Sequence, residues 1–358
     1  MPDDKSAPQK NSKLTKPISL GRVFLVGIPA LLCCVVLATM LGAVPVSLLA
    51  ILRSLVSAIG IPSGFIDPAD RTVILLIRLP RVAAAVLAGG GLAISGTVMQ
   101  GIFRNPLAEP GILGVSAGAS LGALVAITTS AASYFILPFY AFLGAMLAVG
   151  VILTVAMFGG GRAGTLTLIM SGMAVGALFG ALTSLTLTAA NQYQVSSYIF
   201  WTMGGLANRR WENVLAILPF VTVTIVVISW KARDLDILLL GDEQARALGV
   251  PPGATRLLLI LLASVCTASI VSMTGPIGFV GLIVPHIMRM LVGPSHRILA
   301  AASAFGGAIF LVLCDLLTRL LAWPTGAELS AGIVTALVGA PYFLFLLFKS
   351  SKRGGQFT

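Results

Sequence analysis

The chain has 358 residues, of which 57% are hydrophobic and only 10% are charged, and its mean hydropathy is +1.01. Soluble domains carry about 25% charged residues, so this composition cannot cover a surface that faces water. It excludes a cytosolic enzyme, a disulfide-stabilised secreted domain and a nucleic-acid-binding protein. The formal net charge of +11 is typical of a membrane protein whose cytoplasmic loops are rich in Lys and Arg.

Ten stretches of the chain have the composition of membrane-spanning helices, each of which needs about 20 mainly apolar residues. We therefore expect an all-α, polytopic membrane protein. The third and eighth spans are short and rich in Gly or Pro. A single transmembrane domain over residues 23–349 leaves a basic tail at 1–22 and a short tail at 350–358. The predicted spans are 23–41, 82–102, 112–128, 134–158, 165–189, 212–230, 257–274, 276–292, 298–318 and 331–348.

The basic residues between the spans indicate the orientation. Placing the amino terminus inside puts all seven lysines and most arginines on the cytoplasmic side, as the positive-inside rule requires. Both termini, with their tails, are therefore predicted to be cytoplasmic. The basic residues left outside are all arginines: Arg53, Arg71, Arg78, Arg81, Arg209, Arg210 and Arg319.

Residues 231–256 form the one substantial polar stretch between predicted spans, and they are expected to be a cytoplasmic loop. Within it, the segment from Gly241 to Pro252 predicts one short helix. Asp242 is expected to cap its amino end, and Gly249 suits a left-handed residue after the last turn. Ala245 and Leu248 are expected to share a face. The pattern alone fits equally well a helix that docks in a partner's groove and a solvated connector.

Arginines at the outer ends of two spans allow two interpretations. Arg78 and Arg81 open the second span, and Arg319 ends the ninth. Arginine just beyond the apolar core is commonly a snorkelling anchor, which the residues alone favour. The alternative is a basic rim that binds carboxylates of an external partner. Asp315 and Arg319 are four residues apart, and we expect them to form a structural ion pair.

One motif is typical of a hydrolase. Gly114–Gly118 matches GxSxG, the nucleophile elbow, and His286 and Asp315 would complete an intramembrane triad around Ser116. The elbow needs a strand-to-helix turn, whereas this segment lies in an apolar run of small residues. Such spacing lets helices approach closely in lipid. The same spacing recurs at Gly172, Gly176 and Gly180.

No other motif indicates catalysis or metal binding. The histidines and cysteines lack the spacing of metal ligands, so no catalytic residue and no metal site are predicted. The chain also contains no GxxxxGK[ST] phosphate-binding loop. ATP-driven work would therefore need a separate subunit.

Helix-breaking residues interrupt the apolar pattern at residues 105–111, 274–278 and 284–286. Irregular backbone at membrane depth is tolerated only where it is buried in protein or lines an aqueous cavity. Breaks of this kind in both halves of the chain predict a translocation path, as in carriers with broken helices.

Several long motifs resemble the FecCD family, the permease subunits of type II ABC importers for iron–siderophore complexes, haem and vitamin B12. The resemblance covers about residues 40–349, with the motifs in the same order. They are Arg78–Arg81, Gly96–Gln100, Arg104–Pro110, Leu113–Gly118, Trp201–Gly205, Gly241–Gly249, Gly275–His286, Glu328–Gly332 and Gly339–Pro341.

This resemblance implies ten spans and a homodimer, or a pair with a related permease, around a central path. It implies two ATPase subunits on the cytoplasmic side, which bind ATP and Mg, and a substrate-binding protein outside. The chain itself would be no enzyme and would bind no cofactor and no nucleic acid. It would lie among the lipids of the bacterial cytoplasmic membrane as a multi-pass protein.

The resemblance also assigns residues to three roles. Arg78, Arg81 and Arg319 match arginines that meet acidic residues of the binding protein, which replaces the anchor interpretation. Asn105, Leu107 and Thr165 match positions near the cytoplasmic gate. The residues that match the ATPase-coupling segment are Gly241, Asp242, Glu243, Arg246, Leu248 and Gly249.

The sequence does not separate the possible substrates. A ferric siderophore is expected because it is the commonest cargo of the family, and haem and cobalamin are the alternatives. The main rival function is a proton-coupled secondary carrier, in which Asp315 and Glu328 would be essential. The intramembrane hydrolase built on Ser116 is the other rival.

Overall fold

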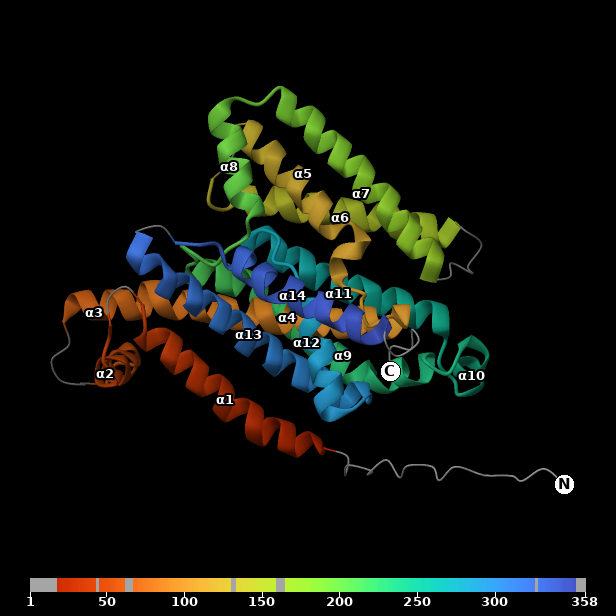
Figure 1. Cartoon of the computed structure of the whole chain (residues 1–358), viewed down its shortest axis with the longest axis horizontal. Coiled ribbons are helices and arrows are strands. Elements are labelled where there is room, and N and C mark those ends of the chain that lie inside the picture. Colours follow the sequence, from red (N-terminus) through yellow and green to blue (C-terminus); the bar gives the residue numbers. More distant parts are fainter. Residues whose placement is uncertain are drawn as a thin grey trace.

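The computed structural model describes residues 18–42, 45–61, 67–129, 133–158, 165–325 and 328–351. Within these ranges every regular element is a helix (Figure 1). Most of the basic amino-terminal tail and residues 352–358 of the predicted carboxyl-terminal tail lie outside the described residues.

The elements follow one another along the chain as a series of apolar helices joined by short segments. They are α1 (Leu20–Met40), α2 (Leu48–Ala58), α3 (Pro68–Thr72), η1 (Val73–Arg78), α4 (Leu79–Phe103), η2 (Pro110–Leu113), α5 (Val115–Thr128), α6 (Ile136–Phe158), α7 (Thr165–Thr188), α8 (Gln192–Thr202), α9 (Trp211–Leu238), α10 (Asp242–Ala247), α11 (Pro252–Thr274), α12 (Val280–Val292), α13 (His296–Thr325) and α14 (Ala331–Ser351).

The predicted spans all correspond to helices, so the all-α, polytopic membrane architecture is confirmed. Seven helices of the described chain are long and apolar enough to cross a membrane, and the second of them runs without a break from Pro68 to Phe103. The spans predicted around α5, α12 and α14 are shorter apolar helices. Two of these three, α5 and α12, correspond to the predicted third and eighth spans, which are short and rich in Gly or Pro.

The predicted loop 231–256 is wrong in its boundaries. Helix α9 continues to Leu238, and α11 begins at Pro252. The reason is a change of pattern, because α9 becomes amphipathic at its end. Ala232, Leu235 and Leu238 are buried on one face, while Arg233 is exposed. Charged residues therefore prolong the helix beyond the apolar span.

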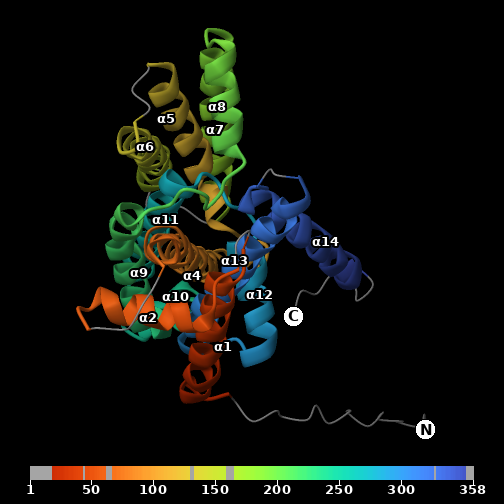
Figure 2. The ribbon, with the colours of Figure 1, turned by 90° about the vertical axis from the view of Figure 1, so that its left-hand side faces the viewer.

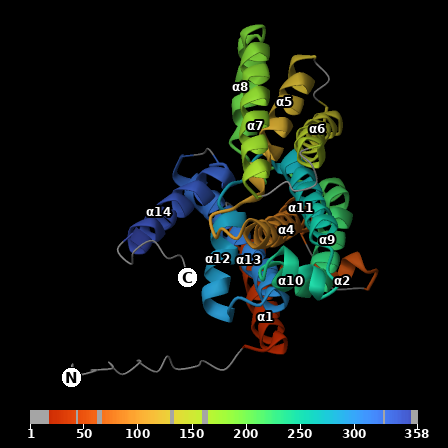
Figure 3. The same ribbon diagram turned by 90° about the vertical axis from the view of Figure 1, so that its right-hand side faces the viewer.

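Helix α4 is the centre of the molecule and is buried along most of its length. It packs against α9, α11, α12 and α13. Figures 2 and 3 show α5–α8 on one side of α4 and α1 on the opposite side. Glycines make these contacts possible: a methyl group on Gly96 would overlap the carbonyl oxygen of Gly281, and one on Gly89 would overlap that of Gly307.

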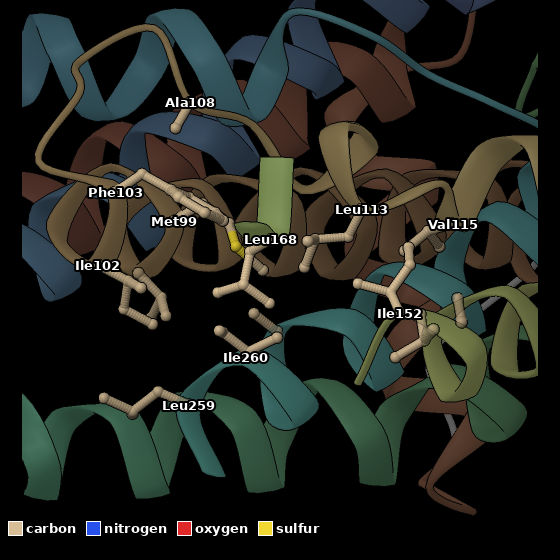
Figure 4. Close-up of a cluster of buried hydrophobic side chains, with 14 of the residues drawn as sticks. Met99, Ile102, Phe103, Ala108, Leu113, Val115, Ile152, Leu168, Leu259 and Ile260 are labelled. Carbon is tan, nitrogen blue, oxygen red and sulfur yellow. The ribbon is translucent and has the colours of Figure 1, made fainter. Parts of the chain in front are cut away.

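A cluster of buried apolar side chains joins the end of α4 to the α5–α7 unit (Figure 4). Met99 and Phe103 of α4 lie in this cluster with Leu113 of η2, Ile152 of α6 and Ile260 of α11. All five side chains are at most 5% exposed. In a membrane their mutual packing gains van der Waals contact rather than transfer out of water, so this cluster fixes how the irregular segment after α4 lies on the bundle.

The close helix packing expected at the spaced glycines is found on α5 but only at one position on α7. Gly118 and Gly122 of α5 pack directly against the backbone of α6 at Gly144 and Tyr140, as predicted. On α7, Gly172 meets the backbone of Ile112. Gly176 and Gly180 face open space instead, so the expectation of close packing there is not met within this chain.

Three segments that the sequence separates widely meet through their backbones. The amide of Gly205 donates to the carbonyl of Thr274 at 2.7 Å, and the amide of Gly332 donates to the carbonyl of Gly204 at 3.0 Å. Gly204 and Gly275 have φ of +62° and +70°. Only glycine adopts this conformation without strain. We name this meeting point, residues 204–205, 274–276 and 330–332, the backbone junction.

Replacing Gly96 with alanine is expected to lower the free energy of unfolding by about 2–3 kcal/mol, because α4 and α12 must separate to admit the methyl group. Thermal unfolding of the detergent-solubilised protein measures the effect. Gly150→Ala on α6 is the matched control, since nothing lies within 4 Å of its added methyl group. Equal stability of the two variants would show that the α4–α12 contact is not tightly packed.

Candidate functional site

The arginines at the outer ends of the spans belong to one buried cluster, which we name the arginine cluster: Arg78, Arg81, Asp315, Arg319 and Glu328. The three arginines are 6–7% exposed and Asp315 is 1% exposed. Helix α4 with η1, helix α13 and the segment before α14 bring the five residues together.

Asp315 lies between two guanidinium groups. Arg81 donates from Nε to both carboxylate oxygens at 3.0 Å, and its Nη2 is 2.9 Å from Oδ1. The Nε of Arg319 is 3.3 Å from Oδ2, which confirms the predicted ion pair within α13. Arg81 also donates from Nη1 to Glu328 at 2.9 Å, and the Glu328 side chain is 43% exposed. Glu328 is thus the one half-open member of the cluster.

The same arginines also close the end of α1. Arg78 donates from Nη1 to the carbonyls of Thr39 (2.7 Å) and Met40 (3.1 Å). Arg319 donates from Nη1 to the carbonyl of Ala38 at 2.8 Å. The last carbonyls of a helix lack partners within the helix and carry partial negative charge. Cations at this place therefore satisfy and stabilise the end of α1.

The local structure of η1 explains how Arg78 reaches α1. Residues Val73–Arg78 form a π-helical turn between α3 and α4. A π turn inserts one extra residue into the helical register. It brings Ile74 and Arg78 onto the buried face, while Pro80 is tolerated because it lies in the first turn of α4.

The burial of these arginines differs from both interpretations of the sequence. They do not reach water as snorkelling anchors, and they do not form an open basic rim. Carboxylates and carbonyls of the chain itself already surround them. Arg81 pairs with Asp315 and Glu328, which lie 234 and 247 positions further along the chain. No local sequence pattern indicates such a pairing. Docking of a binding protein at Arg78, Arg81 and Arg319 stays a prediction.

Helix α10 lies at the other end of the molecule from α2 and α3 (Figure 1). It is a short helix, as predicted, but its cap differs. Gly241, with φ of +119°, is the capping residue, and Asp242 is the first residue of the helix. The prediction of Asp242 as the cap is therefore wrong. Gly249 is left-handed with φ of +79°, as predicted.

The structure also shows which residues in and after α10 are buried and which are exposed. Ala245 is fully buried against the bundle, whereas Leu248 is 59% exposed, so these two residues do not share a face. Leu248 lies just after the last turn rather than inside the helix. Glu243, Arg246 and Leu248 are exposed, so they are available to a partner.

Asp242 anchors α10 to the next helix. Its carboxylate accepts two hydrogen bonds from Arg256, at 3.0 and 2.5 Å. This pairing holds the pKa of Asp242 below its usual value. A depressed pKa stabilises the fold above the usual carboxyl pKa, and this contribution is lost as the pH falls through the lowered value. The anchor is therefore constant across physiological pH.

The gate residues lie in the irregular segment after α4. The side chain of Asn105 accepts a hydrogen bond from the amide of Leu107 at 2.9 Å, which closes a tight turn. Arg104 before it is left-handed with φ of +48°. Thr165 is the first residue of α7, and its side chain lies outside the described residues.

The same irregular segment contacts the second helix break. Glu109 accepts a hydrogen bond from the backbone of Phe279, the left-handed residue that caps the start of α12. Burial raises the pKa of Glu109 above its usual value, and this hydrogen bond partly opposes the rise. The irregular segments after α4 and after α11 thus contact each other through this hydrogen bond. This contact agrees with the rule that irregular backbone at membrane depth is buried in protein.

The sequence model of the FecCD transport family matches residues 30–349. The chain belongs to the FecCD family. It is 44% identical over 295 residues to the cobalamin import system permease protein BtuC of Halobacterium salinarum, covering 82% of this chain and 78% of that protein. It is 39% identical over 284 residues to the hemin transport system permease protein HmuU of Yersinia pestis, covering 78% and 84%.

The fold is also similar to that of a solved ABC transporter. A solved structure of a metal-chelate type ABC transporter in an inward-facing conformation superposes with a TM-score of 0.81 at 33% identity, covering 92% of this chain and 99% of that one. The chain is therefore the permease subunit of a type II ABC importer of the FecCD family, and a multi-pass membrane protein.

The structure and the family answer the two rival hypotheses. The GxSxG segment starts a helix at Gly114 and follows a 3-10 turn, so the nucleophile elbow is absent there. Asp315, the expected proton carrier of a secondary transporter, is shared by two buried arginines. The family model places the chain among permeases of ABC importers rather than among proton-coupled carriers.

Replacing Asp315 with asparagine is expected to cost about 3–5 kcal/mol of folding free energy, because it leaves buried Arg319 without a counter-charge and Arg81 with only the half-exposed Glu328. Asp234→Asn is the matched control, and removing its partly exposed pair with Lys231 should cost less than about 1 kcal/mol. Thermal unfolding in detergent compares them. A loss no larger for Asp315 than for Asp234 would contradict a structural role for the cluster.

Proposed function

We propose that the chain imports a bulky metal chelate by alternating access, driven by separate ATPase subunits at the α10 end and supplied by a binding protein at the arginine-cluster end. The observation that carries this proposal is the position of α10. It is an exposed, firmly anchored helix at the opposite end of the molecule from the arginine cluster.

The anchoring of α10 suits force transmission. The Asp242–Arg256 pair ties α10 to α11, and Ala245 packs against the bundle. A partner that pulls on Glu243, Arg246 or Leu248 would therefore move α11 as well. Because α11 reaches the backbone junction at Thr274 and Gly275, closure of the ATPases on ATP and Mg would act at both ends of the permease.

The α10 end is then cytoplasmic, and both termini lie on that side of the bacterial cytoplasmic membrane. Helix α1 runs from the α10 side toward α2 and α3 in Figure 1, in agreement with this orientation. Gly176 and Gly180 on α7 leave an open strip of small residues, which suits close packing of a second permease copy in the membrane.

The cargo we propose is a ferric siderophore, with haem and cobalamin as alternatives. The relatives support a metal chelate as the class of cargo, since one is a cobalamin permease and another a hemin permease. Recognition of the individual chelate would then occur on the binding protein. Uptake of radiolabelled ferric siderophore, hemin and cobalamin by cells that carry the complete importer discriminates among the three.

A P-loop ATPase is expected to accompany the tagged permease through affinity purification in mild detergent. Arg246→Glu and Leu248→Asp should each reduce its recovery at least about tenfold, because buried Arg and apolar anchors carry most of the energy of an interface. Arg233→Glu on α9 is the matched control, since Arg233 is also an exposed arginine. Recovery unchanged in all three variants would refute docking on α10, and transport by the permease alone would refute the importer.

Docking on the arginine cluster requires an exchange of carboxylates. Arg81 is 7% exposed, and its accessible partner is Glu328. A carboxylate of the binding protein would replace Glu328 on the guanidinium group. Glu328 lies two residues before Ser330 of the backbone junction. Release of Glu328 would therefore free the start of α14 to move when the binding protein docks.

Replacing Glu328 with glutamine is therefore expected to tighten docking of the binding protein about twofold to fivefold, because a competing ion pair of up to about 1 kcal/mol is removed. Surface plasmon resonance with the immobilised permease measures the Kd. Glu212→Gln, at an exposed position of α9, is the control and should leave the Kd unchanged. Weaker docking of the Glu328 variant would contradict the exchange.

A further inference from the structure

A cavity of about 450 Å³ lies where the end of α4, the approach to α10 and the end of α12 meet. This volume falls in the range of small-molecule sites. Its lining contains two arginines and one histidine, and no lining residue is acidic. The lining residues are Gln100, Arg104, Asn105, Pro106, Leu239, His286, Arg289, Met290 and Pro294.

Three lining side chains have buried polar atoms without a hydrogen-bond partner among the described residues. They are Oε1 of Gln100, Nδ1 of His286 and Nε of Arg289. Gln100 is only 3% exposed, and its amide nitrogen donates to the carbonyl of Leu282 at 2.9 Å, which fixes its orientation. Nε of Arg289 is a donor that an anion would satisfy, and Nδ1 of His286 is a donor in one of its two tautomers. Oε1 of Gln100 is an acceptor, which needs a hydroxyl group or a water molecule as its partner.

The local charges favour an anion as this ligand. Arg104 uses Nη2 to bind the carbonyl of Leu238 at 2.7 Å, which fixes its guanidinium group at the cavity. The carboxylate of Asp236 acts on Arg289 from a neighbouring position. It is already bound, however, by the backbone amide of His296 at 3.0 Å and by its Nδ1 at 2.6 Å. Asp242 likewise acts on Arg104. Neither carboxylate lines the cavity, so within the lining itself the two guanidinium groups face no negative charge.

We propose that this cavity binds a carboxylate or phosphate group at the α10 end of the permease, with Arg104 and Arg289 as its charged ligands. Guanidinium groups bind both anions in bidentate geometry. The bound anion would join α4, α12 and the segment that leads into α10. Because Asn105 also lines the cavity, the site lies next to the predicted gate.

Titration calorimetry of the purified permease in a neutral detergent tests the site, with citrate and inorganic phosphate as probes. We expect saturable binding of one anion per chain. Arg289→Gln should weaken it about tenfold to hundredfold, as expected for loss of hydrogen bonds to a charged group. Arg289→Lys, which keeps the charge and the fold, should weaken it by less. Arg233→Gln, an exposed arginine outside the cavity, should leave binding unchanged.

Binding of neither probe, or equal weakening by Arg233→Gln, would overturn the proposal. The source of the anion follows from repeating the titration in nanodiscs. Loss of citrate binding in phosphatidylglycerol but not in phosphatidylcholine assigns the site to a lipid headgroup, and binding in both lipids assigns it to a soluble anion. These measurements need neither the ATPase nor the cargo, so their failure would leave the proposed import function standing.

Discussion

The sharing of Asp315 by two buried guanidinium groups is the interaction on which one end of this permease depends. A buried charge is costly unless it is paired and hydrogen-bonded. Asp315 pairs Arg81 with Arg319, Glu328 accepts from Arg81, and a carbonyl at the end of α1 accepts from Nη1 of Arg319. Four segments of the chain must therefore meet at one point. This requirement fixes the end of α1 against α4 and α13.

The second constraint is steric. Gly89 and Gly96 of α4 lie against Gly307 and Gly281, so the backbone of α4 touches those of α13 and α12 at these two points. Lipid gives no hydrophobic drive to helix association, and such close packing replaces it. The same smooth contacts suit small sliding movements of packed helices, which are one of the recurrent forms of conformational change.

The sequence was sufficient for features that depend on local composition. The lengths of the apolar stretches predicted the helices, and Gly249 predicted the end of α10 because a left-handed residue is needed there. It was insufficient where distant residues decide the outcome. Asp242 is a residue type that commonly caps helices, but its carboxylate binds Arg256 instead. The burial of Arg81 depends on residues more than 230 positions away, and only the assembled fold reveals it. The charged end of α9 was mistaken for a loop because hydropathy alone hides its amphipathic face.

Helix α4 connects the two candidate sites. Arg81 lies at its beginning in the arginine cluster, and Gln100 and Arg104 line the cavity at its end. A helix of this length spans about 35 Å, close to the thickness of a bilayer. Since α4 is buried by its neighbours along most of its length, a rigid shift of α4 itself would disturb every contact at once. Movement of α12 over the glycine face of α4 disturbs fewer contacts, whereas the Arg81–Asp315 pair ties α13 to α4. The alternating access that we propose for this permease would therefore be a movement of helices around α4, controlled by the ion pairs at one end of α4 and by the cavity at the other.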